Sequence, residues 1–147
     1  MAFEVKNDVL IKYIPQEDIK EIKTEDGIAK VVLKTSTVIV PDGVEVIGKG
    51  CFQSSICDVI LPSSVTEIRD FAFDICNGSV WIPVSVVKIS EYAFGDLEWR
   101  RAALQKAIEE GALKNPNPPI VQSVIKTTEN STAHIFAVEH GIPFELV

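Results

Sequence analysis

The sequence predicts a single, mostly β domain: a short right-handed solenoid of stacked coils with α-helical additions. The main observation is a unit of 21 residues that occurs three times between Val38 and Phe94. Fixed repeat periods in the twenties are typical of solenoids, in which each repeat forms one coil. The second observation is size, because 147 residues with 46% hydrophobic content suffice for one sizeable core.

The three units align without a gap. Each begins with a short apolar run that ends at a proline, continues through a valine and an isoleucine, and closes with a small residue followed by phenylalanine. The aligned positions are Pro41, Pro62 and Pro83; Val44, Val65 and Val86; Ile47, Ile68 and Ile89; Cys51, Ala72 and Ala93; Phe52, Phe73 and Phe94. Equivalent residues of stacked coils form ladders about 4.8 Å apart. We therefore expect the Val, Ile and Phe ladders to form a continuous core.

The repeat and both ends of the chain resemble the BspA-like leucine-rich repeats of bacteria. The pattern I/L-P-x-x-V-x-x-I-x-x-x-A-F covers residues 38–94. The opening FEVKNDVLIKY resembles that family's starting hairpin, and STAHIFAVEHGIPFEL resembles its closing helix. The repeat is shorter than is usual in the family, and residues 14–37 and 97–119 depart from the pattern and are interpreted as insertions. The resemblance implies a leucine-rich-repeat-type solenoid that binds proteins, with adhesion as the role of secreted members.

The N-terminal flank is expected to close one end of the stack. Residues 1–37 form a β cap in this prediction, with two strands around the KND turn at 6–8. The segment EDGIAKVVLKTSTVIV adds a further strand pair before the coils of residues 38–96. Such a cap would cover an open sheet edge, which is otherwise prone to pairing with other chains.

The C-terminal flank is expected to be partly helical. Residues 97–119 are a helical insertion and linker, because Asp96 is a suitable N-cap, Gly111 a suitable stop, and KNPNPP excludes a helix. Residues 120–147 form a last strand, IVQSVI, a capping helix and an extended tail. Asn130 or Ser131 begins that helix, and its inward residues are Ala133, Phe136 and Ala137.

Charge and hydropathy argue against several classes of partner. The net charge is −7, and residues 38–94 alone carry three basic and seven acidic groups. A nucleic acid backbone or an anionic membrane would be repelled. No run of about 18 apolar residues predicts a membrane span. The charged start lacks the apolar run of a signal peptide, so we expect a cytoplasmic protein, or a surface or secreted one if a leader was removed.

No motif predicts catalysis, a cofactor or a metal. Glycine-rich phosphate-binding motifs do not occur. His134 and His140 do not share a helix face, and we interpret both as solvated helix residues. The cysteines lack the spacing of a zinc site or a disulfide framework. They are Cys51, which occupies a small core position, Cys57 in a loop, and Cys76. An uncharacterised enzyme with His134 or Glu98 in a deep pocket remains an alternative.

A row of outward apolar residues is the candidate binding surface. Side chains alternate across a strand, so if Val38, Val59 and Val80 point inward, Ile39, Ile60 and Trp81 point outward. The resembled family usually has a polar residue at this position. Contiguous exposed apolar residues are typical of contact surfaces, and Trp is common at their energetic centres. The predicted function is a non-enzymatic scaffold that binds an unidentified protein partner through this row.

Three questions about this row stay open at the level of sequence. In one reading the helix at 97–110 covers this row, and Ile39, Ile60 and Trp81 are then part of the core. In another reading a second copy of the chain binds it, giving a self-associating structural protein. Trp99 is a further candidate, which either tucks under the linker or extends the binding surface.

Overall fold

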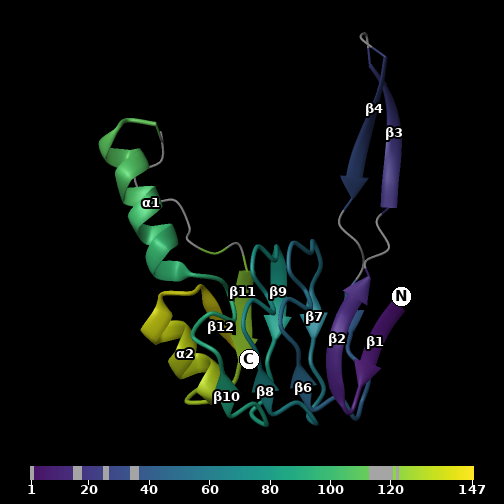
Figure 1. The fold of residues 1–147 in the computed structure, drawn as a ribbon, viewed down its shortest axis with the longest axis vertical. Helices are drawn as coiled ribbons and strands as arrows, with labels where there is room; N and C mark the ends of the chain where they lie inside the picture. The colour runs from purple at the N-terminus through teal and green to yellow at the C-terminus, as the bar shows by residue number, and fades with distance from the viewer. Residues whose placement is uncertain (1, 15–17, 25–26, 34–36, 113–120, 122) are drawn as a thin grey trace.

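The computed structural model describes residues 2–14, 18–24, 27–33, 37–112, 121 and 123–147, whose strands form two five-stranded sheets and a separate hairpin (Figure 1). Sheet 1 has the order β1-β2-β6-β8-β10 and sheet 2 the order β12-β11-β9-β7-β5. The strands of sheet 1 are β1 Ala2–Lys6, β2 Val9–Ile14, β6 Val46–Ile47, β8 Glu67–Ile68 and β10 Lys88–Ile89. Those of sheet 2 are β5 Val38–Ile39, β7 Val59–Ile60, β9 Gly78–Trp81, β11 Ser123–Thr127 and β12 Phe144–Leu146. The helices α1 Leu97–Glu109 and α2 Thr132–His140 complete the described part of the chain, which is mostly β.

The 21-residue spacing sets the register of both sheets. Val38 pairs with Val59 and Val59 with Val80 in sheet 2, and all three strands are parallel. In sheet 1 the isoleucines of the three units pair in the same way, Ile47 with Ile68 and Ile68 with Ile89. Each unit therefore contributes one short strand to each sheet, as the repeat predicts.

The phenylalanines stack in the same order. The rings of Phe52 and Phe73 lie 5.4 Å apart between centroids at an interplanar angle of 2°, and those of Phe73 and Phe94 lie 5.5 Å apart. Their backbones are joined as well, since the Phe52 N–H donates to the Ala72 carbonyl at 2.8 Å. The predicted stacking is confirmed, and all three rings are fully buried in one core cluster with the Val and Ile ladders.

The N-terminal hairpin agrees with the prediction, whereas the second strand pair does not. β1 and β2 are antiparallel around Asn7 and Asp8, which have positive φ angles of 52° and 63°, and β2 also pairs with β6. The predicted pair within residues 25–40 is wrong. β4 (Gly27–Leu33) pairs instead with β3 (Asp18–Thr24), because β5 bonds to β7. In Figure 1 the β3–β4 hairpin projects away from the two sheets.

The first C-terminal element is the helix α1, as predicted. The Asp96 side chain accepts a hydrogen bond from the Trp99 N–H at 3.0 Å, so Asp96 is the N-cap. Gly111 follows the helix at a φ of 71°. The predicted linker at 114–119 lies outside the described residues. No helix of the described part has both the length and the apolarity to cross a membrane.

The last three elements are β11, α2 and β12. The two strands extend sheet 2, and the helix α2 lies beside β10 of sheet 1. β11 pairs with β9 as the predicted fourth rung, although the strand begins only at Ser123. Ser131 is the N-cap of α2, and Ala133, Phe136 and Ala137 are buried as expected. The predicted tail is a strand, β12, which pairs in parallel with β11.

The two sheets extend to different lengths beyond the third repeat unit. Among the described residues, sheet 2 continues past β9 with β11 and β12, whereas β10 is the last strand of sheet 1. The helix α2 lies beside β10 in the space beyond that strand (Figure 1). The ring of Phe136 reaches Phe94 at 6.1 Å between centroids and so continues the phenylalanine stack.

Candidate functional site

The outward residues of sheet 2 form one row across all five strands. The register places Ile39 beside Ile60 and Ile60 beside Trp81. Trp81 pairs in turn with Lys126, and Lys126 with Glu145. We call these residues the outward row: Ile39, Ile60, Trp81, Lys126 and Glu145. The intervening inward valines are fully buried, so the predicted alternation of the strands is confirmed.

The outward row changes from apolar to charged along its length. Ile39 is 63% exposed, and Ile60 and Trp81 are half-buried. The Lys126 Nζ lies 4.7 Å from the centroid of the Trp81 ring, a distance at which a cation is attracted to the face of an indole. The same ammonium group lies 3.3 Å from a Glu145 carboxylate oxygen. The ion pair thus holds a cation against Trp81 and leaves the isoleucine end open to solvent.

Prolines widen the apolar surface beside this row, a feature that was not predicted from the sequence. Pro41, Pro62 and Pro83 each lie two residues after an outward residue, and they are exposed or half-buried. Residues two apart share a face where the chain is extended. Proline rings are apolar, and proline has no backbone N–H. These residues therefore add apolar surface without adding an unsatisfied hydrogen-bond donor. The signal for this surface is the repeat itself, which places a proline two residues after each outward position.

The helix α1 leaves the outward row uncovered. Leu97 is the single buried residue of this helix, and Ile39 keeps most of its surface. Two arginines hold α1: Arg100 pairs with Asp74 at 2.6 Å, and Arg101 donates to the His140 carbonyl oxygen. Trp99 is 70% exposed on this helix, which projects from the sheets in Figure 1. Trp99 is therefore an exposed aromatic side chain, and its part in the binding surface stays a prediction.

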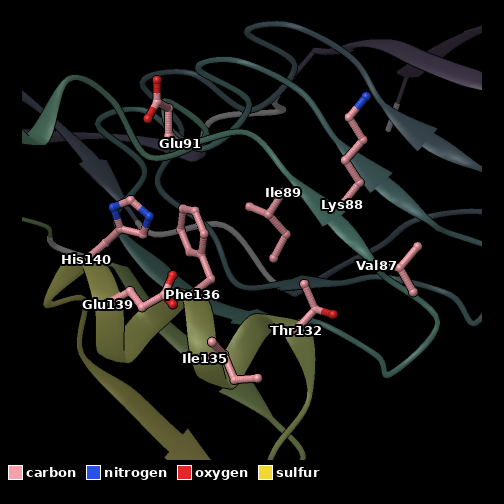
Figure 2. A pocket seen from close by; sticks show the side chains of 9 residues that line it. All are labelled: Val87, Lys88, Ile89, Glu91, Thr132, Ile135, Phe136, Glu139 and His140. Carbon is pink, nitrogen blue, oxygen red and sulfur yellow. The ribbon is translucent and has the colours of Figure 1, made fainter.

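A groove lies between β10 and α2 on another side of the molecule (Figure 2). Its volume is about 390 Å³, within the range of ligand-binding clefts. Figure 2 shows Ile89 and Phe136 near its centre, with Val87 and Thr132 toward one end and Glu91, Glu139 and His140 toward the other. The remaining lining residues are Lys88 and Ile135.

The histidines and cysteines take structural positions. His134 Nδ1 accepts a hydrogen bond from the Asn130 N–H at 2.8 Å, and its ring contacts Phe144. The ring of His140 lies 4.2 Å from that of Phe136. The three cysteines are all buried, including the loop residue Cys57. Among the described residues, no group of three or more His, Cys, Asp or Glu side chains is placed to hold a metal ion.

Acidic residues gather next to the groove. A neighbouring hollow is lined by Glu91, Tyr92, Asp96, Leu97, Glu98, Arg101, Glu139 and His140. The carboxylate of Glu91 raises the pKa of the Tyr92 phenol, and partial burial, Asp96 and Glu98 act in the same direction. A raised phenol pKa means that this region disfavours additional negative charge.

A protein-family model described as BspA type leucine rich repeat region matches residues 17–117 in six copies. The match covers more than half of the chain. It includes residues 17–37 and 97–117, most of the two segments interpreted above as insertions. Repeat arrays of this kind are typical of protein-interaction modules. No significant match was found among curated proteins or among solved structures.

Proposed function

Because this chain belongs to the BspA type leucine rich repeat family, we propose that it is a non-enzymatic scaffold that binds a protein partner. The observation that carries the proposal is the apolar part of the outward row, Ile39, Ile60 and Trp81, with the prolines beside it. Rows of contiguous apolar residues on a surface mark contact sites, and aromatic anchors commonly supply most of the binding energy.

The proposed architecture is one right-handed solenoid domain of residues 1–147. The parallel register of the repeats and the stack of phenylalanines support it. In this proposal β1 and β2 cap one end of the stack and α2 caps the other. A rigid stack supports binding because the row residues are held in place before the partner arrives, which lowers the entropic cost of association.

The proposed partner is a protein rather than a nucleic acid or a membrane. The net charge of −7 opposes polyanions, whereas the isoleucine end of the row carries no charge. Proteins with such repeats are typically found at the bacterial surface or secreted, and the row would act in adhesion there. Self-association through the same row is the alternative occupant, and the experiment below separates the two.

A charge at Ile39 tests the proposal, and Ile75 provides a matched control. Ile39 and Ile75 are isoleucines with 63% and 64% exposure, but Ile75 lies in a turn outside the row. We expect Ile39→Arg to abolish capture of the partner from an extract of the source organism, whereas Ile75→Arg retains it. Quantitative mass spectrometry of captured proteins measures the difference, and circular dichroism verifies that both variants are folded.

Light scattering on the purified protein identifies the occupant. A wild-type dimer that Ile39→Arg converts to monomer, while Ile75→Arg does not, assigns the row to self-association. A monomer with a partner lost only in Ile39→Arg supports the scaffold. Equal capture by both folded variants, together with an unchanged mass, would remove the row from the function.

A further inference from the structure

The hydrogen bonds between successive repeat units show which backbone groups of β10, the last strand of sheet 1, could pair with a further strand. In the first unit the carbonyl of Glu45 accepts from the Thr66 N–H at 2.8 Å, and that of Ile47 from the Arg69 N–H at 3.0 Å. The second unit repeats this with the third. Thr66 accepts there from Val87 at 3.0 Å, and Ile68 from Ser90 at 2.9 Å. Each unit thus presents two carbonyls to the unit that follows.

The equivalent groups of the third unit are the carbonyls of Val87 and Ile89. Alternate residues of a parallel strand bond to opposite neighbours. Lys88 donates to Thr66, so the N–H and C=O of Ile89 point away from β8. Within the described part of the chain no strand pairs with β10 on that side. The helix α2 lies there instead, and the groove separates it from the strand.

The groove offers apolar contacts beside these backbone groups. Val87 is 69% exposed and Ile135 is half exposed, while Ile89 and Phe136 are more deeply placed between them. A peptide strand alongside β10 would bury these side chains and satisfy the backbone groups at once. This combination is the requirement for binding by β-strand addition.

The negative charge at one end of the groove favours peptides that carry a basic residue. Glu91 and Glu139 line one end, and the adjoining hollow adds Asp96 and Glu98. Of the nearby cations, Lys88 points away from Glu91 in Figure 2, and Arg101 is engaged with the His140 carbonyl. A Lys or Arg side chain complements such a site.

We propose that the groove between β10 and α2 binds an extended peptide segment that adds to β10 as a further strand. The segment carries an apolar residue over Ile89 and, two positions along, a Lys or Arg directed toward Glu91 and Glu139. The spacing of two follows from the alternation of a strand, because Ile89 and Glu91 are themselves two residues apart. The site is separate from the outward row and does not depend on it.

A fluorescently labelled peptide, STVTRTS, is the probe. We expect saturable binding to the full chain with a Kd below about 1 mM. Replacing its Arg by Glu should weaken binding by about tenfold or more, since opposite charges at this end are replaced by like charges. N-methylation of the Thr between Val and Arg should also weaken binding by about tenfold, because it removes an N–H that pairs with the strand edge. Fluorescence anisotropy measures all three constants.

Variants of the protein locate the site. Val87→Arg should weaken binding of the probe by about tenfold or more, because it replaces an apolar part of the groove wall by a charged side chain that the bound peptide would have to desolvate. Val84→Arg is the matched control, since Val84 is 62% exposed but does not line the groove. The double change Glu91→Lys and Glu139→Lys should reverse the preference, so that the Glu peptide binds better than the Arg peptide.

Three outcomes would overturn the proposal: no saturable binding of the probe, equal affinity for the Arg and Glu peptides, or equal weakening by the Val87 and Val84 changes. Ile39→Arg should leave the peptide affinity unchanged. Loss of peptide binding in that variant would also contradict the proposal, because it would place the peptide on the outward row. Partner capture through the row can fail while peptide binding persists, so the two proposals are tested separately.

Discussion

Phe73 occupies the centre of the phenylalanine stack, with Phe52 and Phe94 on its two sides. It is fully buried, and backbone hydrogen bonds from Phe52 to Ala72 and from Phe73 to Ala93 hold the successive units in register. The neighbours therefore cannot move far into a space left by its ring. This position shows why the repeat stabilises the fold: one side chain contributes contacts to two layers.

Replacing Phe73 by Ala tests this role. We expect Phe73→Ala to lower the free energy of unfolding by about 3–5 kcal/mol, the range for buried aromatic residues that leave a cavity. Urea denaturation followed by circular dichroism measures the change. Phe144→Ala is the control, because Phe144 lies exposed on the outermost strand and should cost about 1 kcal/mol or less. Equal losses for the two changes would mean that the stack does not support the core.

Residues of the outward row could be predicted only within the 21-residue repeats of residues 38–94. The positions of Ile39, Ile60 and Trp81 follow from a spacing of 21 and from strand alternation. Lys126 and Glu145 complete the row, but their strands lie outside that spacing. The register beyond β9 depends on the length of the intervening chain and on how α2 packs, and neither can be read from a pattern.

Among the elements, those with local signals were predicted and those fixed by distant contacts were not. Asp96 and Ser131 accept the hydrogen bonds expected of N-caps, so both helices begin where their caps predict. The segment that contains β12 was predicted only as an extended tail. It becomes a strand through bonds to β11. The groove has the same origin, since it forms where β10 ends sheet 1 and a helix follows.

Gly78 determines how closely β9 approaches the preceding unit. Its φ is 152°, and a Cβ at this position would lie 2.1 Å from the Cys57 carbonyl oxygen, which is backbone and cannot move aside cheaply. We expect Gly78→Ala to reduce the free energy of unfolding by about 3 kcal/mol or more, because it combines backbone strain with a clash inside the sheet.

Gly111→Ala is the control for that prediction. Gly111 also has a positive φ, at 71°, but apart from its chain neighbours no atom of the described residues lies within 4 Å of its added Cβ. Its replacement should cost only about 1 kcal/mol, the strain of the left-handed conformation. Thermal unfolding of both variants measures the difference. If the Gly111 change lowers stability as much as the Gly78 change, conformational strain rather than close packing is the reason that position 78 requires glycine.

At the scale of the whole molecule, each repeat unit is bonded to the units before and after it. The backbone N–H of Val40 donates to the carbonyl of Ile60 in the next unit, and the N–H of Phe73 in that unit donates to the carbonyl of Ala93 in the one after. In such arrays stability is approximately a sum of units and of interfaces between neighbours. The chain should therefore tolerate the loss of a whole unit better than the loss of a part of one.

Deletion of residues 59–79 removes one complete unit of 21 residues, so that Asp58 precedes Val80 as Ser79 does in the native chain. Every remaining residue keeps its face, and we expect a folded protein with a cooperative thermal transition at a lower temperature, because one interface is lost. Deletion of residues 59–78 removes 20 residues and offsets the residues that follow by one. A shift of one residue turns buried side chains outward, so this variant should show no cooperative transition. Circular dichroism at increasing temperature compares the two proteins. Similar unfolding curves would show that strict repeat length does not set the register, and with it the alignment of the outward row would lose its basis.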